Sequence, residues 1–509
     1  MKGKIIAWLI IGFIGVPLLL FFGTALVLFL APGFEIFGIR YVAKSVVDFK
    51  EEKILPSFNG DIYIDSFDVP VNIEYAATSG VQVLFRQEYV GFTRTKEKQP
   101  SLSVKIDKNG NAKISTIEIR KFIFASDITD SYYLDIRLPS NCGAIYVDAE
   151  TSNVTMKGIT GNAPRVEIET EGKFKIENTM KIGTLDLTSN ADVKIDSNVT
   201  MTNAIIKTGN KYISIANKVT GDLDLTNTSG SIAFNECNNL KVKTSSGFIK
   251  SSVKDGAVVN GKVDITTKSG DVKIDKIIGT SEKSYINTKT GEININYVND
   301  IKIVSDRGVV NIGQGRNIVV DGGAGDVTIG GIDERVVVNS TNGKVVLGSN
   351  NGATITNPTV NTTTGKIYAY NTYGTVSLVS TNNLVYVKNT KGIGATKFKL
   401  SAGRELTAKN LEGDVSVYAN GDVSLHFQSL TKDVNVSVGT KCRAVKIDAK
   451  CRLYDEVNYV LKSSKNKSAS VYSGGTLVTR GNPVNRVNLV AAPKITVTGA
   501  YQVTTLYFE

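Results

Sequence analysis

The chain has 509 residues, a formal net charge of +11 at pH 7 and 41% hydrophobic residues, with 47 glycines but only one histidine and four cysteines. Regularly placed Val and Ile exclude an intrinsically disordered chain, and so few cysteines exclude a scaffold that depends on disulfides. The sequence contains no CxxC pair and no basic block with interleaved aromatic residues, which argues against a zinc or redox motif and against nucleic-acid binding.

An uninterrupted apolar stretch runs from Ile5 to Leu30 without a charged residue. As a helix it would be about 39 Å long, more than the ~30 Å of a membrane's hydrocarbon core. A cleavable signal peptide is the alternative. We favour an uncleaved anchor, because the exit Phe29-Leu-Ala-Pro32 lacks a small residue at the −3 position. The sequence therefore predicts a transmembrane signal anchor over residues 5–30, after a short N-terminus over residues 1–4.

The orientation of this span is read from its flanking charges. Lys2 and Lys4 precede it, whereas four basic residues follow it between Arg40 and Lys53. This count alone favours an outside N-terminus, but long domains translocate largely regardless of flanking charges. We expect a single-pass protein of the cell membrane, with a cytoplasmic N-terminus and the body of the chain outside the cytoplasm.

A short glycine motif recurs eleven times between Gly230 and Gly421. Apolar residues stand two and four positions after the glycine, except at Gly247, where Ser251 occupies the fourth position. In many copies apolar residues also stand seven and five positions before the glycine. This period of two is the signature of β-strands, whose successive side chains point to opposite faces. The clearest copies are Thr267-Lys-Ser-Gly-Asp-Val-Lys-Ile274, Thr288-Lys-Thr-Gly-Glu-Ile-Asn-Ile295 and Ser340-Thr-Asn-Gly-Lys-Val-Val-Leu347.

One repeat reads as a strand, a glycine turn, a second strand and a second turn. From Gly230 to Gly365 the glycines lie 17, 23, 21, 17, 17, 18 and 22 residues apart. A coil of this size cannot bury its own inward side chains, but stacked coils bury them in a continuous column. We therefore predict an all-β fold, an elongated and flattened β-solenoid (β-helix). Its interior is expected to include Val272, Ile274, Ile293, Ile295, Val310 and Ile312.

The repeat also suggests how the chain is organised. A juxtamembrane segment over residues 31–56, with a short amphipathic helix near residues 42–49, leads into an N-terminal β region and cap over residues 57–140. Regular solenoid repeats are expected over residues 141–429, and a C-terminal β region and cap over residues 430–509. Atypical ends are expected because an open solenoid end exposes strand edges.

Several motifs resemble those of a known family. Tyr133-Leu-Asp-Ile-Arg-Leu-Pro139 is followed by Ala144-Ile-Tyr-Val147 and then by the glycine motifs, among which Thr267-Lys-Ser-Gly-Asp-Val272 is the best copy. Over roughly residues 59–430 the chain resembles the putative-adhesin β-strand-repeat family of uncharacterised bacterial cell-envelope proteins. One departure is Thr151-Ser-Asn-Val154, which lacks the glycine expected there. The resemblance implies a membrane-anchored β-solenoid of unknown ligand and carries over no catalytic residues.

Few side chains are candidates for chemistry. His426 stands at one of the polar, outward-facing positions of its strand and is expected to be a surface residue, so it is a weak candidate for a general base. Carboxylates at alternate positions of one strand could bind Ca²⁺ or act on a glycan, but they are explained more simply as part of the solvent-exposed outer face. Gly322-Gly-Ala-Gly-Asp326 is similar to a calcium-binding nonapeptide, with its aspartate one place early. The carboxylates at alternate positions are Asp222 with Asp224, and Asp271 with Asp275 around Lys273.

The remaining candidates are cysteines and glycosylation sequons. Cys442 and Cys451 either pair with each other or stay as buried free thiols. The sequons at Asn198, Asn227 and Asn361 matter only in a host that glycosylates secreted proteins. We therefore predict no catalytic, cofactor-binding or metal-binding residues.

The function that fits these features is a non-enzymatic surface scaffold or adhesin-like binder, held to the membrane by residues 5–30. Because the net charge is positive and weak repeated contacts favour a polymer, an anionic cell-envelope polymer is the first candidate partner and a surface protein the second. Two alternatives remain open. One is a cytoskeletal β-solenoid polymer on the cytoplasmic side, and the other is a carbohydrate-active β-helix enzyme.

Overall fold

The computed structural model describes residues 14–509 apart from residues 30, 32–34, 37–38, 43–46, 67–68, 89–90, 95–100, 118–130, 141, 159–160, 252–257, 280–282, 351, 391–394 and 488. The chain divides into two compact units. Unit 1 is Met1–Thr220 and unit 2 is Gly221–Glu509, so that the division falls within β19 (Lys218–Thr226).

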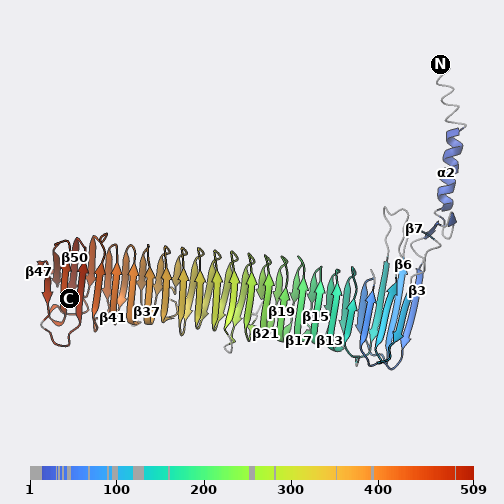
Figure 1. The fold of residues 1–509 in the computed structure, drawn as a ribbon, viewed down its shortest axis with the longest axis horizontal. Coiled ribbons are helices and arrows are strands. Elements are labelled where there is room, and N and C mark those ends of the chain that lie inside the picture. Colours follow the sequence, from blue (N-terminus) through green and yellow to red (C-terminus); the bar gives the residue numbers. More distant parts are fainter. Residues whose placement is uncertain are drawn as a thin grey trace, which may run out of the picture. The chain divides into compact units, whose positions relative to one another are not determined.

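Unit 2 is built from two parallel sheets whose strands alternate along the chain (Figure 1). In a typical coil one strand precedes the motif glycine and a second strand follows it. The strands that pair with the preceding ones form the leading sheet, and the strands that pair with the following ones form the trailing sheet. The leading sheet contains β21 (Glu236–Thr244), β24 (Val263–Thr267), β26 (Ser284–Thr288), β28 (Ile301–Ser305), β30 (Ile318–Gly322), β32 (Val336–Ser340), β35 (Pro358–Thr362), β37 (Thr372–Ser380), β39 (Ala395–Ala402), β41 (Asp414–Ala419), β43 (Val434–Val438), β45 (Asn458–Ser463) and β49 (Lys494–Gly499). The trailing sheet contains β20 (Ile232–Phe234), β22 (Ile249–Ser251), β25 (Val272–Ile277), β27 (Ile293–Val298), β29 (Val310–Gly315), β31 (Val327–Ile332), β33 (Val345–Leu347), β36 (Ile367–Tyr370), β38 (Val385–Lys388), β40 (Leu406–Leu411), β42 (Val423–Phe427), β44 (Ala444–Asp448), β46 (Ala469–Ser473) and β50 (Val503–Phe508).

The interior of unit 2 confirms the predicted β-solenoid. Strands of successive coils pair in parallel and in register, so that Ile274, Ile295 and Ile312 lie one above another. All six interior residues predicted from the repeat are at most 2% exposed. Residues between them on the same strands, such as Lys273, point to solvent. The alternation of apolar and polar residues therefore sets which face of every strand is buried.

Coils in the middle of unit 2 have a third, short side that the repeat did not predict. The pairing of β25 with β27 skips Asp275 and resumes as a separate short ladder, in which Ile277 pairs with Val298. β29 and β31 continue this ladder, and β23 (Val258–Val259) and β34 (Ile355–Thr356) extend it. Both Ile277 and Val298 are buried. The predicted two-strand, flattened coil is thus incomplete, because the coils that contain Ile277 and Val298 each bury one further apolar residue on a short third side.

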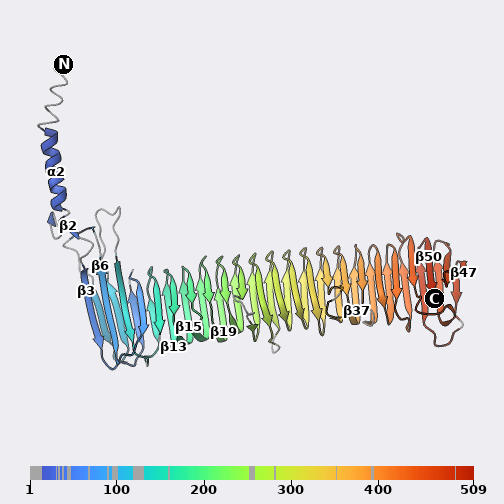
Figure 2. The same cartoon turned by 180° about the vertical axis from the view of Figure 1, so that it is seen from behind.

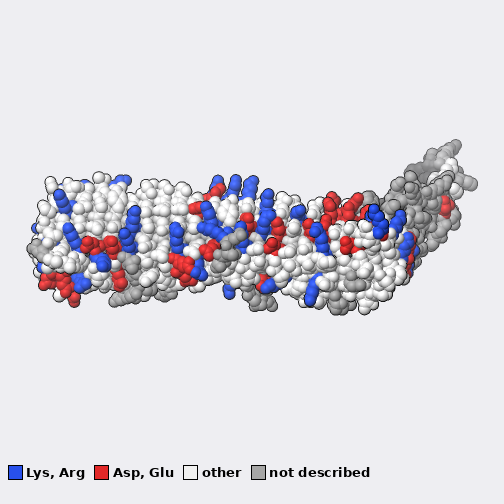
Figure 3. Space-filling view, turned by 60° about the horizontal axis from the view of Figure 1, so that its bottom comes forward, with Lys and Arg blue, Asp and Glu red and all other residues white. Residues whose placement is uncertain are grey.

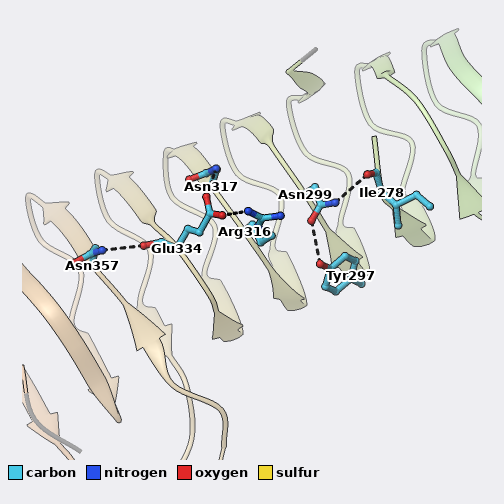
Figure 4. A network of polar contacts seen from close by, with 7 residues as sticks. All are labelled: Ile278, Tyr297, Asn299, Arg316, Asn317, Glu334 and Asn357. Carbon is cyan, nitrogen blue, oxygen red and sulfur yellow. Dashed lines mark hydrogen bonds and ion pairs between the residues drawn. The ribbon is translucent and has the colours of Figure 1, made fainter. Parts of the chain in front are cut away.

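Asparagine side chains join neighbouring coils where the short side ends (Figure 4). Nδ2 of Asn299 donates to the carbonyl of Ile278 at 2.9 Å, and Nδ2 of Asn357 donates to that of Glu334 at 3.1 Å. Asn357 has a φ of +47° and Asn317 a φ of +38°, a region that asparagine tolerates better than most residues. The side chain of Glu334 accepts from Asn317 at 2.7 Å and forms an ion pair with Arg316.

The motif glycines allow neighbouring coils to approach closely. A Cβ atom placed on Gly291 would lie 2.0 Å from the carbonyl oxygen of Gly270, and one on Gly308 would lie 2.0 Å from that of Gly291. Close approach of the backbones therefore explains these glycines, whereas a left-handed φ occurs at Gly374 (+72°) and Gly413 (+81°). The same contact with the preceding motif glycine recurs at Gly247, Gly270, Gly325, Gly343 and Gly365.

A buried hydroxyl three residues before the glycine completes the same turn. Oγ1 of Thr267 accepts the N–H of Gly270 at 2.8 Å, and Oγ1 of Thr288 accepts that of Gly291 at 3.0 Å. Both threonines are at most 4% exposed. Because a buried N–H left without a partner costs about 1–3 kcal/mol, the recurring Thr or Ser of the motif has a structural role.

Unit 1 repeats this architecture in its own coils. Its leading sheet contains β4 (Ile62–Ser66), β9 (Ala112–Ile117), β11 (Ile145–Asp148), β13 (Gly161–Thr170), β15 (Met180–Ser189) and β17 (Val199–Thr208). Its trailing sheet contains β5 (Val71–Tyr75), β10 (Ser131–Leu138), β12 (Val154–Gly158), β14 (Phe174–Glu177), β16 (Val193–Ile195) and β18 (Ile213–Ile215). A separate small sheet contains β1 (Glu35–Ile36), β2 (Ile39–Val42) and β7 (Gly91–Arg94). The remaining strands are β3 (Val47–Leu55), β6 (Val81–Glu88) and β8 (Ser101–Ile106).

At one end of each unit the coils depart from chain order (Figure 2). In unit 1, β4 lies between β9 and β11, and β5 lies between β10 and β12. In unit 2, β49 lies between β43 and β45, and β50 lies between β44 and β46. Antiparallel strands then cover the last coil: β8, β6 and β3 in unit 1, and β48 (Val484–Arg486) and β47 (Thr476–Gly481) in unit 2.

The N-terminal region holds one described helix, α2 (Val16–Phe29), of 14 residues. Within the part of the chain that the structure describes, no helix is both long and apolar enough to cross a membrane. The structure therefore does not support the predicted span over residues 5–30 as a complete helix, and residues 5–13 and 30 of that span lie outside the described residues. The amphipathic helix predicted near residues 42–49 is wrong, because β2 ends at Val42 and β3 begins at Val47.

Candidate functional site

The carboxylate that follows a motif glycine bonds to the next coil. Oδ1 of Asp271 accepts the N–H of Glu292 at 2.8 Å, and Oδ1 of Asp326 accepts that of Lys344 at 2.8 Å. Asp275, also predicted to lie on the same strand face as Asp271, accepts a hydrogen bond from Asn296 of the next coil. These carboxylates therefore hold coils together, which accounts for their recurrence without a ligand.

Asp222 and Asp224 lie together, as predicted, in a hollow of about 610 Å³ on unit 2. The hollow also contains Lys241, whose Nζ lies 2.6 Å from Oδ2 of Asp224, while Asp222 accepts from Asn239 at 2.8 Å. The hydrogen bond from Lys241 to Asp224 raises the pKa of the lysine. Lys241 is exposed and Asp224 is half-buried, so this surface ion pair contributes little to stability. Asp222 and Asp224 are thus partnered within the solenoid surface.

The other predicted candidates do not converge on a site. His426 is exposed on β42, as expected for a surface residue. Asn227 is buried and accepts the N–H of Gly230 at 2.6 Å, whereas Asn198 and Asn361 are exposed. Among the residues that the structure describes, no group of three or more His, Cys, Asp and Glu side chains is arranged to hold a metal ion.

All four cysteines are free thiols. Cys442 and Cys451 do not pair with each other, which decides the alternative left open by the sequence. Burial raises the pKa of Cys442 to about 11 and that of Cys237 to about 12. Because the thiolate is the reactive form, neither thiol is a nucleophile near neutral pH.

A second hollow, of about 700 Å³, lies on the leading sheet of unit 1 and was not predicted. At its centre the rings of Tyr63 and Tyr146 stack with centroids 4.6 Å apart and planes 6° from parallel. We call it the tyrosine hollow. Its other lining residues are Ile64, Asp65, Asp107, Asn109, Asn111, Lys113, Ile114, Ser115, Val147, Asp148, Glu167 and Glu169.

The tyrosine stack follows directly from a short repeated sequence. Ile62-Tyr-Ile-Asp65 on β4 pairs in parallel, residue by residue, with Ile145-Tyr-Val-Asp148 on β11. Parallel strands in register place like residues over one another, so Tyr63 meets Tyr146 and Asp65 meets Asp148. Both segments are visible in the sequence, but the long separation between them hides their adjacency.

The tyrosine hollow carries a negative potential. Partial desolvation raises the pKa of Tyr63, and the nearby Tyr146, Asp61, Asp107 and Glu167 raise it further. At the rim, the N–H groups of Asn111 and Asn109 donate to Oδ1 of Asp107 at 3.0 and 2.8 Å. These bonds, with that of Asn111 the largest contribution, lower the pKa of Asp107 and keep it ionised.

Comparison with known proteins places this part of the chain in a family. Residues 59–312 match the model of a family described as Toastrack DUF4097. These residues belong to the Toastrack family. The predicted resemblance to a family of uncharacterised β-repeat proteins is confirmed in this form, and no curated protein matches the chain.

The Toastrack region contains both hollows, since their lining residues fall between Tyr63 and Gly279. Among solved structures, the chain is similar to the crystal structure of a "putative cell adhesion protein" from Clostridium sporogenes ATCC 15579. The two share 14% sequence identity, with 48% of this chain and 98% of that chain covered and a TM-score of 0.18.

Proposed function

We propose that this chain is a membrane-anchored, extracytoplasmic β-solenoid that acts as a non-enzymatic surface scaffold or adhesin-like binder. The observation that carries the proposal is the structural use of the repeat. Its glycine, its buried hydroxyl and its carboxylate each contact a neighbouring turn or coil, as at Gly291, Thr288 and Asp271. The repeat therefore builds a stack and leaves ligand contact to the outward side chains.

The character of α2 supports the membrane anchor. Leu19, Phe21 and Val27 are 74%, 71% and 69% exposed, and large apolar side chains of this helix are exposed on all sides. A helix that is apolar all round belongs in a protein core or in a membrane. At about 1.5 Å per residue, α2 covers roughly 21 Å of a hydrocarbon core of about 30 Å. The proposal therefore requires the apolar sequence that begins at Ile5.

The ends of the units favour this proposal over a cytoskeletal polymer. A filament built by stacking solenoids needs open terminal coils, whereas here a coil out of chain order and antiparallel strands cover one end of each unit. The enzymatic alternative has no comparable support, because Asp222, Asp224 and Asp271 are engaged in surface bonds. Turnover of a glycan polymer by the purified chain, lost on changing one acid, would contradict a non-enzymatic role.

Membrane orientation is the decisive test. In a chain carrying Cys451→Ser, we expect Lys467→Cys to react with a membrane-impermeant maleimide on intact cells, because residue 467 is exposed on unit 2. The matched variant Lys4→Cys should react only after the membrane is opened. Labelling is read by mass shift on a gel. The reverse pattern would place the solenoid in the cytoplasm and favour the polymer alternative.

An anionic cell-envelope polymer remains the first partner we propose for the surface as a whole. The net charge is +11, and basic and acidic side chains are interleaved on the face seen in Figure 3. We expect the full-length protein in detergent to bind poly(glycerol phosphate). The affinity should fall steeply when salt is raised from 50 to 500 mM, because salt screens exposed charges beyond the Debye length, which is about 10 Å at 0.1 M. Neutral dextran is the control. Salt-independent binding, or none at low salt, would rule out this partner.

A further inference from the structure

The tyrosine hollow combines two features that the solenoid repeat does not require. The stacked rings of Tyr63 and Tyr146 lie at outward positions, and Tyr63 is 36% exposed. Around them the hollow is lined by five carboxylates and one ammonium group, that of Lys113. One of the five, Glu167, forms an ion pair with Arg165 at 2.8 Å, so four carboxylates remain for a ligand. An aromatic surface bordered by carboxylates is suited to an organic cation, because cations are attracted both to the ring faces and to the acids.

Three of the carboxylates form a row across neighbouring strands. Asp65 on β4 pairs in register with Asp148 on β11, which pairs with Glu169 on β13. Adjacent strands are about 4.8 Å apart, and like charges opposite each other are unfavourable. All three side chains are exposed. The row therefore costs stability and is not explained by the fold.

A row in unit 2 shows one way in which such repulsion is avoided. Asp321 pairs in register with Asn339, which pairs with Asn361. Nδ2 of Asn339 donates to Oδ1 of Asp321 at 2.9 Å. A carboxylate next to an amide gains a hydrogen bond from that amide. Asp148 lies between two carboxylates that cannot donate to it, and its Oδ1 accepts the backbone N–H of Glu150 at a long 3.4 Å. A cation between the three side chains would supply the donors that the row itself does not contain.

We propose that the tyrosine hollow binds a linear ligand that carries several primary ammonium groups. Its charges pair with Asp65, Asp148 and Glu169 along the row, and its carbon skeleton packs on the stacked rings of Tyr63 and Tyr146. This inference rests on the proposed binding function and names one ligand class for it. The hollow is locally acidic although the whole chain is basic, so it selects against the anionic polymers that the remaining surface attracts.

The shared chemistry, repeated primary amines, can come from a free polyamine or from an amine-bearing sugar chain. Isothermal titration of the full-length protein in detergent with spermine and with a glucosamine tetramer separates these sources. The N-acetylglucosamine tetramer, which lacks the charges, is the matched control ligand. We expect binding of at least one of the two amines, weakened by added salt, and no heat from the acetylated tetramer.

Three variants test the site itself. Asp148→Asn should weaken amine binding about tenfold or more, the size of one lost charge-assisted contact, while its melting temperature stays equal or rises because the row loses a like charge. Lys113→Gln should tighten amine binding, since it removes the ammonium group that lines the hollow. Asp306→Asn, on unit 2 and outside the hollow, should leave binding unchanged.

Each outcome decides the proposal. Equal binding of the acetylated and free-amine tetramers, or no binding of either amine, would overturn it, as would weaker amine binding by Lys113→Gln. If Asp148→Asn fails to fold, the Lys113→Gln titration alone carries the test. Lack of amine binding together with maleimide labelling of intact cells would reject this ligand class and leave the scaffold proposal standing.

Discussion

Replacing Gly308 by alanine is expected to destabilise unit 2 by on the order of 3 kcal/mol. The new Cβ would lie 2.0 Å from the carbonyl oxygen of Gly291 and 3.0 Å from the hydroxyl of Ser305. The first contact is with backbone that is fixed by the parallel pairing of β27 and β29. Relief therefore requires the two coils to move apart, which breaks ladder hydrogen bonds. Chemical denaturation followed by circular dichroism measures the loss.

Gly322→Ala is the matched control for this prediction. Gly322 lies in the neighbouring coil, and a Cβ there would approach no atom closer than 3.6 Å. Its φ is not in the left-handed region, so we expect a change within about 0.5 kcal/mol. A loss at Gly322 as large as that at Gly308 would show that the close contact between coils does not explain the glycine at position 308.

Which side chains of the solenoid are buried was predictable, because the alternation of inward and outward positions along a strand is a local property of the sequence. Strands with a period of two have only two choices of inward face, and apolar residues at fixed distances from the glycine select one of them. The buried pairs Val272 with Ile274 and Ile293 with Ile295 follow directly. That a glycine marks each turn was visible in the sequence. How closely Gly308 approaches Gly291 was not, because that distance depends on the spacing between coils.

The third side of the coil was hidden by its shortness. Ile277 and Val298 follow the main strands after a polar interval, and two apolar residues in a turn do not form a pattern that periodicity can detect. The buried Thr288 was hidden for another reason. Threonine after a strand reads as the start of a polar turn, whereas here its hydroxyl accepts the N–H of Gly291 inside the coil.

The arrangement at the ends of the units depends on contacts between distant segments. That atypical strands lie near both ends of the chain could be expected, because open coils expose unpaired strand edges. The placement of β4 between β9 and β11 could not, since each pairing joins strands separated by about fifty to eighty residues. Similarly, the segment near residue 47 has helical periodicity but is a strand, because β6 provides a pairing partner.

The tyrosine hollow was accessible in principle from the sequence. Ile62-Tyr-Ile-Asp65 and Ile145-Tyr-Val-Asp148 are near copies, and parallel register would stack them if they belonged to adjacent coils. Chain order places about eighty residues between them, and only the insertion of β4 next to β11 brings them together. The departure from chain order thus creates the aromatic stack, and with it the candidate site.

Replacing Ile295 by aspartate is expected to destabilise unit 2 by about 4 kcal/mol at neutral pH, because an unpaired charge enters an apolar column. Ile295 is 2% exposed and lies between Ile274 and Ile312. Burial disfavours the ionised form, so the folded-state pKa of the new carboxyl would exceed its unfolded value near 4. The loss is therefore complete above that raised pKa and shrinks as the pH falls towards about 4.

Asn294→Asp is the matched control, because it adds the same charge at the adjacent outward position. Oδ1 of Asn294 already accepts from Asn311 at 2.9 Å, and a carboxylate oxygen can accept the same bond, so we expect a change below about 0.5 kcal/mol. Urea midpoints for both variants at pH 7.5 and pH 4.5 test the argument. An Ile295 variant whose midpoint matches the control, or whose loss is the same at both pH values, would show that residue 295 does not face a dry interior.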